Sequence, residues 1–343
     1  MGMDTSSADS YVYAKASGML ASSYVGRRAV KLFSVRSLQE LWTLVSDSEV
    51  PAVPETILAK MLELEARNSF VSSYKKLISN YAVPAPILVS LLHFYDYDNL
   101  KEVGAALCFY EKEMPDIVDT SPFSMVNYSK WPDIKQITKG SPLAWYDRVP
   151  LLNEQQKNDY RLDVQYLREL WQNVGRVNPS CKDALTKLLL EKINIDNVLW
   201  ALRLKMYYKM QGKEITEQLA YSTDQKLSGD IFVREAMKVL DWDLSNYEQW
   251  KTWRYAELLN PHEEGEVWTV DPRWISNAHK REYVSRALKT FHLYPFTECP
   301  LVCWFIVKRN ELDAIRTVSE GLRMNVSMNR AMQMAGVTED SNG

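Results

Sequence analysis

Two pairs of aspartates, each pair spaced two residues apart, carry the most suggestive chemistry in the chain. Asp96 and Asp98 form one pair, and Asp241 and Asp243 form the other. Helical enzymes that act on diphosphates hold Mg²⁺ with such carboxylates, but they need several oxygen ligands from facing helices. Residues i and i+2 lie on different faces of a helix, so neither pair chelates well from a regular helix. A helical Mg²⁺–diphosphate enzyme is therefore only an alternative interpretation.

The chain offers little else for catalysis or cofactor binding. Its four histidines stand in unrelated contexts, with no His-Glu-x-x-His pair and no Gly-x-Ser-x-Gly turn beside them. No Gly-x-x-x-x-Gly-Lys-Ser/Thr loop is present to cradle a nucleotide. Cys299 and Cys303 are close enough to share a helix face, but only His292 lies near them, and a metal site needs more ligands. We predict no catalytic residue, cofactor, metal or nucleotide site.

Composition and charge exclude two further classes of function. Of the 343 residues 46% are apolar and 25% are charged, which is typical of a globular fold, and the net charge of −3 provides no long-range attraction for nucleic acid. The longest strongly apolar run covers only residues 301–307. A membrane-spanning helix needs about 20 such residues. We therefore expect a core helix there, and no nucleic-acid partner.

The elements that position these residues are expected to be helices. Apolar residues recur every three or four positions over 56–81, 162–174, 183–210, 283–291 and 300–324. The pattern in the first of these segments skips one turn around Arg67. Prolines and glycines separate the segments, and no alternating run has the length and β-branched content of a strand. The sequence predicts an all-α protein.

The segment around the first aspartate pair recurs twice. Asp96-Tyr97-Asp98-Asn99 returns as Asn194-Ile195-Asp196-Asn197, and in weaker form as Glu311-Leu312-Asp313-Ala314. The central aspartates lie 98 (196 − 98) and then 117 (313 − 196) residues apart. A second motif, two apolar residues three apart, begins at 38, 134 and 247, which gives nearly the same intervals. Long periods of this kind predict one helical unit built three times.

The repeats predict three similar helical domains, at about 1–92, 93–190 and 191–343, with the C-terminal helix in the third and some helices crossing between them. Within the repeats we interpret Asp96 and Asn194 as N-caps, whose side-chain oxygens accept the first free amide hydrogens. Asp98 and Asp196 would then lie in the first turn, where the helix dipole favours negative charge. Glu311 fills a cap position poorly, so the third helix is expected to run through from the 300s.

Three blocks of the sequence resemble the C-type rotor protein of V/A-type rotary ATPases, which is equivalent to the d-type protein of eukaryotic vacuolar ATPases. The blocks are the opening Tyr11-Val12-Tyr13-Ala14-Lys15-Ala16, the repeat at 96–101, and a C-terminal pattern that runs from Tyr294-Pro295-Phe296 through Trp304, Lys308, Glu311, Ile315 and Arg316. The opening helix departs from the family at Lys15 and Ser17, where members often have Asn and Arg. Together the blocks span residues 11–324.

The resemblance implies a funnel of three helical domains around a pseudo-threefold axis. It implies a non-catalytic rotor subunit at the cytoplasmic face of a membrane, between the central shaft (subunits D and F) and the ring of proteolipid subunits, in ATP-driven proton or sodium transport or in ATP synthesis. We also expect the first helix to pack on the last and close the ring of domains. An unrelated helical scaffold or adaptor is the alternative, although common helical arrays repeat every 33 to 47 residues or so.

Overall fold

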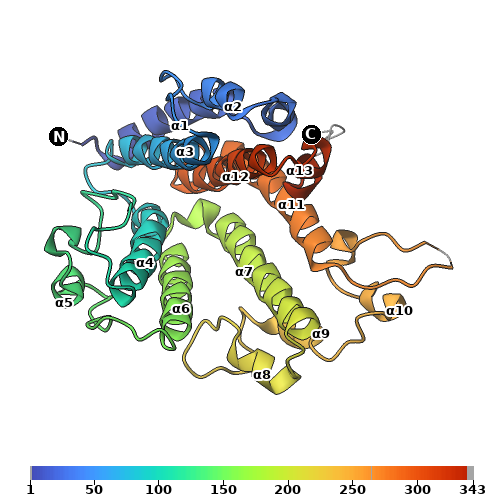
Figure 1. Cartoon of the computed structure of the whole chain (residues 1–343). Coiled ribbons are helices and arrows are strands. Elements are labelled where there is room, and N and C mark those ends of the chain that lie inside the picture. Colours follow the sequence, from blue (N-terminus) through green and yellow to red (C-terminus); the bar gives the residue numbers. More distant parts are fainter. Residues whose placement is uncertain (1, 264, 338–343) are drawn as a thin grey trace.

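The computed structural model describes residues 2–263 and 265–337, and the chain is helical throughout (Figure 1). Turns and loops join its α-helices and short 3-10 helices. The described residues contain no β-strand, only an isolated bridge between Met3 and Tyr81. The prediction of an all-α protein is confirmed. It rested on apolar residues at three- and four-residue spacing, which place one buried face along each helix.

Three long helices form the frame, and each packs against an antiparallel partner. The pairs are α4 (Pro86–Cys108) with α6 (Gln155–Val174), α7 (Pro179–Tyr207) with α11 (Pro272–Leu293), and α12 (Cys299–Arg323) with α3 (Glu55–Ile78). Each long helix has a proline in its first turn, where the missing amide hydrogen breaks no helical hydrogen bond. The five helical segments expected from the sequence all lie in these pairs.

Shorter elements complete the molecule. Near the N-terminus lie α1 (Thr5–Ser22), η1 (Gly26–Ser34) and α2 (Leu38–Val45), and near the C-terminus lies α13 (Met328–Met334). The segment between α4 and α6 contains η2 (Tyr128–Lys130) and α5 (Ile134–Thr138). The segment between α7 and α11 contains α8 (Gly212–Glu217), α9 (Arg234–Val239), α10 (Tyr247–Trp250) and η3 (Ala256–Leu258).

One central hydrophobic core joins all three helix pairs. The N-terminal halves of α4, α7 and α12 meet there, and Trp304 of α12 stacks on Phe70 and Tyr74 of α3, with ring centroids 5.8 and 5.9 Å apart. A second core spans residues 193–278, and a third combines residues 32–62 with 314–331. Because α7 and α12 each run from the central core into an outlying one, the three cores form a single stiff body. The expected domain edges at 92/93 and 190/191 fall inside α4 and α7.

The two ends of the chain pack together. Helix α1 lies against α12, and the Tyr13 ring meets Phe291 of α11 with centroids 5.3 Å apart. The Tyr13 hydroxyl also hydrogen-bonds His292 Nδ1 at 3.0 Å. Figure 1 shows α1, α2 and α3 beside α12 and α13. The expectation that the first helix packs on the last is confirmed.

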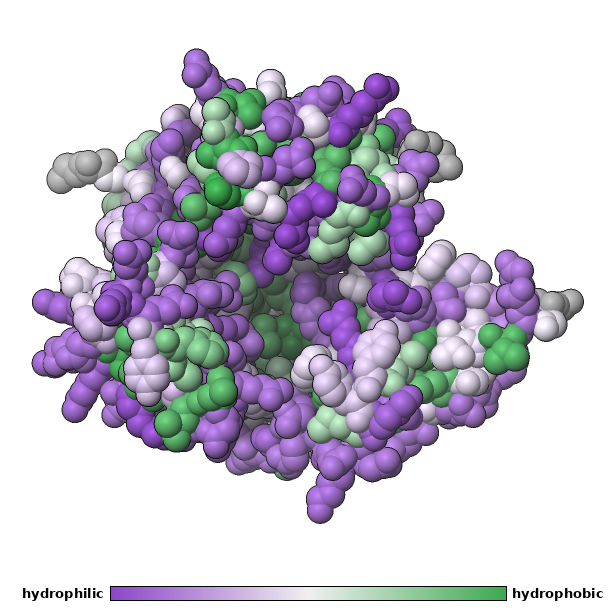
Figure 2. Space-filling model, viewed as in Figure 1, coloured by the Kyte–Doolittle hydropathy of each residue, from purple (hydrophilic) through white to green (hydrophobic). Residues whose placement is uncertain are grey.

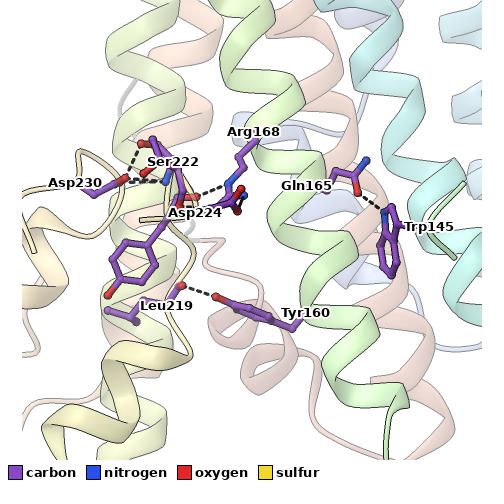
Figure 3. A network of polar contacts seen from close by, with 10 residues as sticks. Trp145, Tyr160, Gln165, Arg168, Leu219, Ser222, Asp224 and Asp230 are labelled. Atoms are coloured by element: carbon purple, nitrogen blue, oxygen red, sulfur yellow. Dashed lines mark hydrogen bonds and ion pairs between the residues drawn. The ribbon is translucent and has the colours of Figure 1, made fainter. Parts of the chain in front are cut away.

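A polar network fixes the long loop after α8 to helix α6 (Figure 3). Arg168 of α6 donates to the backbone oxygens of Tyr221 at 2.9 Å and Thr223 at 2.5 Å, and its guanidinium pairs with Asp224. Further along the loop, Asp230 accepts from the Ser222 amide and hydroxyl. The loop is therefore fixed to the rest of the protein by α6, which belongs to the neighbouring helix pair.

Candidate partner-binding site

The repeated motif does not start helices. Helix α4 begins at Pro86 and α7 at Pro179, so Asp96 and Asn194 lie in helix interiors, and the prediction that they are N-caps is wrong. The apolar residues before each motif already belong to the helix, and the proline marks its start. The prediction that the third helix runs through from the 300s is confirmed, because α12 begins at Cys299.

The first position of the motif instead holds a loop to its helix from inside the fold. Asp96, Asn194 and Glu311 are 0%, 5% and 5% exposed. Asp96 accepts from the Met125 amide at 2.7 Å, Asn194 donates to the Ile231 carbonyl at 3.0 Å, and Glu311 accepts from the amide of residue 24 at 2.5 Å. Burial raises the pKa of the Asp96 carboxyl, although its hydrogen bonds oppose that shift.

The asparagine at the fourth position of the motif forms hydrogen bonds with the loop that follows its helix, and we call this set of bonds the asparagine clasp. Asn99 accepts from the Val118 amide at 2.9 Å and donates to the Val118 carbonyl at 2.8 Å. Asn197 does the same with Ala220, at 2.9 Å for both bonds, and also donates to the Phe232 carbonyl at 2.8 Å. A side-chain amide suits this task because it carries a donor and an acceptor side by side. The third copy has Ala314 here, buried in the third core.

The aspartate at the third position of each motif faces away from these loops. The side chains of Asp98, Asp196 and Asp313 are 47%, 50% and 55% exposed, and each lies beside a lysine. Asp98 is 3.8 Å from Lys101, Asp196 pairs with Lys192, and Asp313 is 3.8 Å from Lys280 of α11. Asp96 and Asp98 therefore point to different surroundings, and the structure does not bring them together as metal ligands.

The C-terminal block joins α12 to the residues at the end of α1. Lys308 of α12 forms an ion pair with Glu311 one turn on, and donates to the Ser23 hydroxyl at 3.0 Å. Glu311 in turn accepts the amide of Tyr24. Arg316 lies on the surface, 3.6 Å from Glu63 of α3. The buried pair fixes the end of α1 to α12, whereas an exposed pair such as that of Arg316 contributes about 0–1 kcal/mol.

The face shown in Figure 2 is hollowed near its middle, with hydrophobic residues at the bottom and mostly hydrophilic ones around. Helices α4, α6, α7, α11 and α12 surround this central hollow (Figure 1). Arg309 of α12 lies against Phe94 of α4. Its guanidinium carbon is 3.7 Å from the centroid of the Phe94 ring, and its charge acts on the hydroxyls of Tyr95, Tyr166 and Tyr283. These residues come from α4, α6 and α11.

Arg67 of α3 carries a second positive charge near Tyr95. Its charge also acts on the Tyr95 hydroxyl, together with the charges of Asp98 and Asp313. Burial nevertheless raises the pKa of Tyr95 to about 12. The sequence patterns did not single out Arg309 or Phe94 as site residues. Arg67 did carry a signal, since the apolar pattern of its helix skips the turn at which it stands.

A histidine–carboxylate pair ties α4 to α6 beside the hollow. His93 Nδ1 lies 2.5 Å from Glu169, and its Nε2 lies 3.1 Å from the Phe123 carbonyl. Because both partners are acceptors, both ring nitrogens carry hydrogen. Burial opposes this charge, but the hydrogen bond and the negative charge of Glu169 outweigh it and raise the pKa of His93. The Tyr97 hydroxyl donates to the other oxygen of Glu169 at 3.0 Å.

Two absences among the described residues bear on function. Residues 2–263 and 265–337 include no cluster of three or more His, Cys, Asp or Glu side chains arranged to hold a metal ion. Over the same ranges, no helix combines the length and apolar character that crossing a membrane requires.

Fold and site together define a class: an all-helical protein in which three antiparallel helix pairs surround a hollow with a polar rim. A model of the ATP synthase (C/AC39) subunit family matches residues 30–334, and the chain belongs to that family. A protein of Treponema pallidum (strain Nichols), named only as an uncharacterized protein, is 29% identical over 93% of this chain and 94% of its own length. The resemblance inferred from the sequence blocks is confirmed.

Proposed function

We propose that the protein is a non-catalytic rotor subunit of a V/A-type ATPase, a socket that couples the central shaft of subunits D and F to the proteolipid ring. It would work at the cytoplasmic face of the membrane, in ATP-driven proton or sodium transport or in ATP synthesis, without cofactor or nucleotide of its own. The observation that carries the proposal is the central hollow in a chain of this family. A hollow with a polar rim suits the end of a shaft.

The proposed mechanism is mechanical. Torque passes only if the shaft does not slip in the hollow and the opposite face does not slip on the ring, so each interface needs roughly 1,600 Å² of buried surface or more. Torque also requires a stiff body. Support comes from α7 and α12, each of which continues from the central core into an outlying one. Packed interiors of this kind deform little.

The same proposal includes a pseudo-threefold arrangement of three domains, near 1–92, 93–190 and 191–343. Its support is the repeated construction: α4, α7 and α12 each carry the motif at mid-helix and each pack on an antiparallel partner. The first two partners follow their long helix in the chain. The third, α3, comes from the start of the chain, so the domain that contains α12 takes elements from both termini.

Affinity purification tests the proposed function. A tagged copy expressed in the source cells is solubilised with its membranes in mild detergent and captured, and the co-purifying chains are identified by mass spectrometry. We expect the shaft subunits and the proteolipid together, with ATPase activity in the eluate. A chain recovered alone, or with partners unrelated to a rotary ATPase, would overturn the proposal. A tagged chain with α12 disrupted by proline at Val307 serves as the unfolded control.

A further inference from the structure

The segment that follows α1 carries a concentrated positive charge. Residues 24–44 contain four basic residues, Arg27, Arg28, Lys31 and Arg36, and a single acidic residue, Glu40. The whole chain has 44 acidic and 41 basic residues, so this segment differs in sign from the rest of the protein. All four basic residues are exposed. A local surplus of this kind attracts an anionic partner even where the net charge of the chain does not.

The 3-10 helix η1 places part of this charge along one exposed edge. In a 3-10 helix, side chains three residues apart lie above one another. Ala29, Leu32 and Val35 follow that spacing and are buried, and η1 packs on α12 and α13. Arg28 and Lys31 follow the same spacing on the neighbouring edge, which is exposed. Because the buried edge fastens η1 to the body of the protein, both cations are held toward the solvent.

A groove of about 650 Å³ lies between η1 and α2, next to these cations. Lys31 and Val35 line it from the side of η1, and Leu44 lines it from α2. Glu40 lines the same groove and accepts the Arg36 amide at 2.7 Å, which places the backbone of Arg36 at the edge of the groove. The groove therefore combines apolar side chains with cations at its margin, and we call the groove and these cations the basic face.

The acidic residues nearby do not cancel the charge of the basic face. The carboxylate of Glu40 lies in the first turn of α2, where the Ser37 hydroxyl accepts the Glu40 amide at 3.2 Å and the helix dipole favours negative charge. Asp47, beyond α2, lines a different pocket, among residues of α1, α3 and α12. Glu320 of α12 lies 3.9 Å from an arginine one turn earlier in its own helix. The other helix packed on η1, α13, contains no acidic residue.

The cations of the basic face have no acidic partner in the part of the chain that the structure describes. Arg28 donates to the Ser22 carbonyl at 3.1 Å and meets no carboxylate there. Lys31 and Arg36 form no ion pair within residues 2–263 and 265–337. All three charges are therefore available to anions outside the protein.

We propose that the basic face binds the surface of a membrane that contains anionic phospholipid. Its cations contact the headgroup phosphates, and the apolar lining of the groove meets the boundary between headgroups and acyl chains. A basic edge beside an apolar groove matches the order of groups at that boundary, which favours lipid over an acidic protein surface. The inference goes beyond the proposed function and does not depend on it, because lipid alone is the partner.

The test is sedimentation of the full-length chain with vesicles of equal parts phosphatidylglycerol and phosphatidylcholine, and with vesicles of phosphatidylcholine alone. We expect binding to the anionic vesicles, weakened by added salt, and none to the neutral ones. The triple variant Arg28→Gln, Lys31→Gln, Arg36→Gln is expected to bind about 100-fold more weakly, because each cation near an anionic surface contributes about fivefold. Absence of binding to anionic vesicles would overturn the inference.

A second triple variant, Lys130→Gln, Lys135→Gln, Lys139→Gln, is the matched control. These lysines are exposed, the change in charge is the same, and they lie in and beside η2 and α5, well apart from α2 (Figure 1). With both variants shown to be folded by their thermal midpoints, the control should bind like the unmodified chain. Equal losses in the two triple variants would refute the inference, because total charge and not the basic face would then govern binding.

Thr43→Glu tests the groove itself. The Thr43 side chain is exposed and lines the groove from α2, so a carboxylate there should repel the headgroups and weaken vesicle binding about fivefold. Unchanged binding would overturn the assignment of the groove to lipid.

Two further measurements separate other anions from lipid. Titration of the chain with inorganic phosphate in a calorimeter should show no saturable binding, and saturable binding without vesicle binding would refute the lipid inference. If the chain ignores anionic vesicles while the first triple variant loses a protein partner, the basic face binds an acidic protein instead. Vesicle binding by a chain that co-purifies with no rotary ATPase would refute the proposed function and leave this inference intact.

Discussion

Removal of the asparagine clasp in the second repeat is the most direct test of what the motif does. Asn197→Ala deletes three hydrogen bonds, to the Ala220 amide and to the Ala220 and Phe232 carbonyls, all between 2.8 and 2.9 Å. At about 1 kcal/mol each, the loss is about 3 kcal/mol of unfolding free energy. Asn99→Ala deletes only two such bonds and should cost about 2 kcal/mol.

The assay is urea denaturation followed by tryptophan fluorescence. Trp250, Trp253 and Trp268 all lie in the second core, so the signal includes the region that the clasp supports. Asn158→Ala on α6 is the control, because the Asn158 side chain makes no hydrogen bond to any described residue, and it should change stability by less than about 0.5 kcal/mol. A loss below about 1 kcal/mol for Asn197→Ala would show that the loop does not depend on the clasp.

Asn197→Asp sharpens the same test. The carboxylate keeps the acceptor for the Ala220 amide but turns a negative charge toward two carbonyl oxygens, so at neutral pH we expect a greater loss than for alanine. Burial and the carbonyl dipoles should raise the pKa of the new carboxyl in the folded protein above that in the unfolded chain. The folded state then binds its proton more readily, so the deficit relative to the unmodified chain should shrink as pH falls.

Three further outcomes are expected. Lys308→Met leaves the Glu311 carboxylate buried without its cation and should cost about 3 kcal/mol in denaturation, while the double variant with Glu311→Gln should recover much of that loss. The stability that His93 gains from Glu169 should be complete below its unfolded pKa of about 6.5 and disappear as pH rises through its raised folded pKa, a slope that His93→Gln removes. Arg168→Ala should accelerate tryptic cleavage after Lys226 severalfold, because the guanidinium no longer holds that loop, and an unchanged cleavage rate would contradict this.

The helices could be predicted from the sequence because their causes are local. Apolar residues at helical spacing over 183–210 and 300–324 mark most of α7 and α12, and each of these helices has a proline in its first turn. The cap predicted at Asp96 lies 11 residues after the observed N-cap, Ala85 (96 − 85), because aspartate is a good cap in isolation. The helix starts earlier because the apolar run before Asp96, which begins at Ile87, is itself helical and buries one face in the central core.

The role of the motif could not be read from the sequence. An asparagine in a helix interior is unfavourable unless its amide finds partners, and the partners of Asn197 lie 23 and 35 residues further along the chain. No feature of the loop sequence predicts that the loop returns to the same helix.

The irregularity of the third repeat goes with the contact between α12 and the end of α1. In the first two copies the loop after the long helix returns to that helix, so an asparagine at the fourth motif position has a backbone to hold. In α12 the position is taken by Ala314, which packs in an apolar core. The backbone that needs holding comes instead from the end of α1. Glu311 receives the Tyr24 amide there, and Lys308 compensates its charge. Glu311 and Lys308, which depart from the repeat, therefore join the end of α1 to α12.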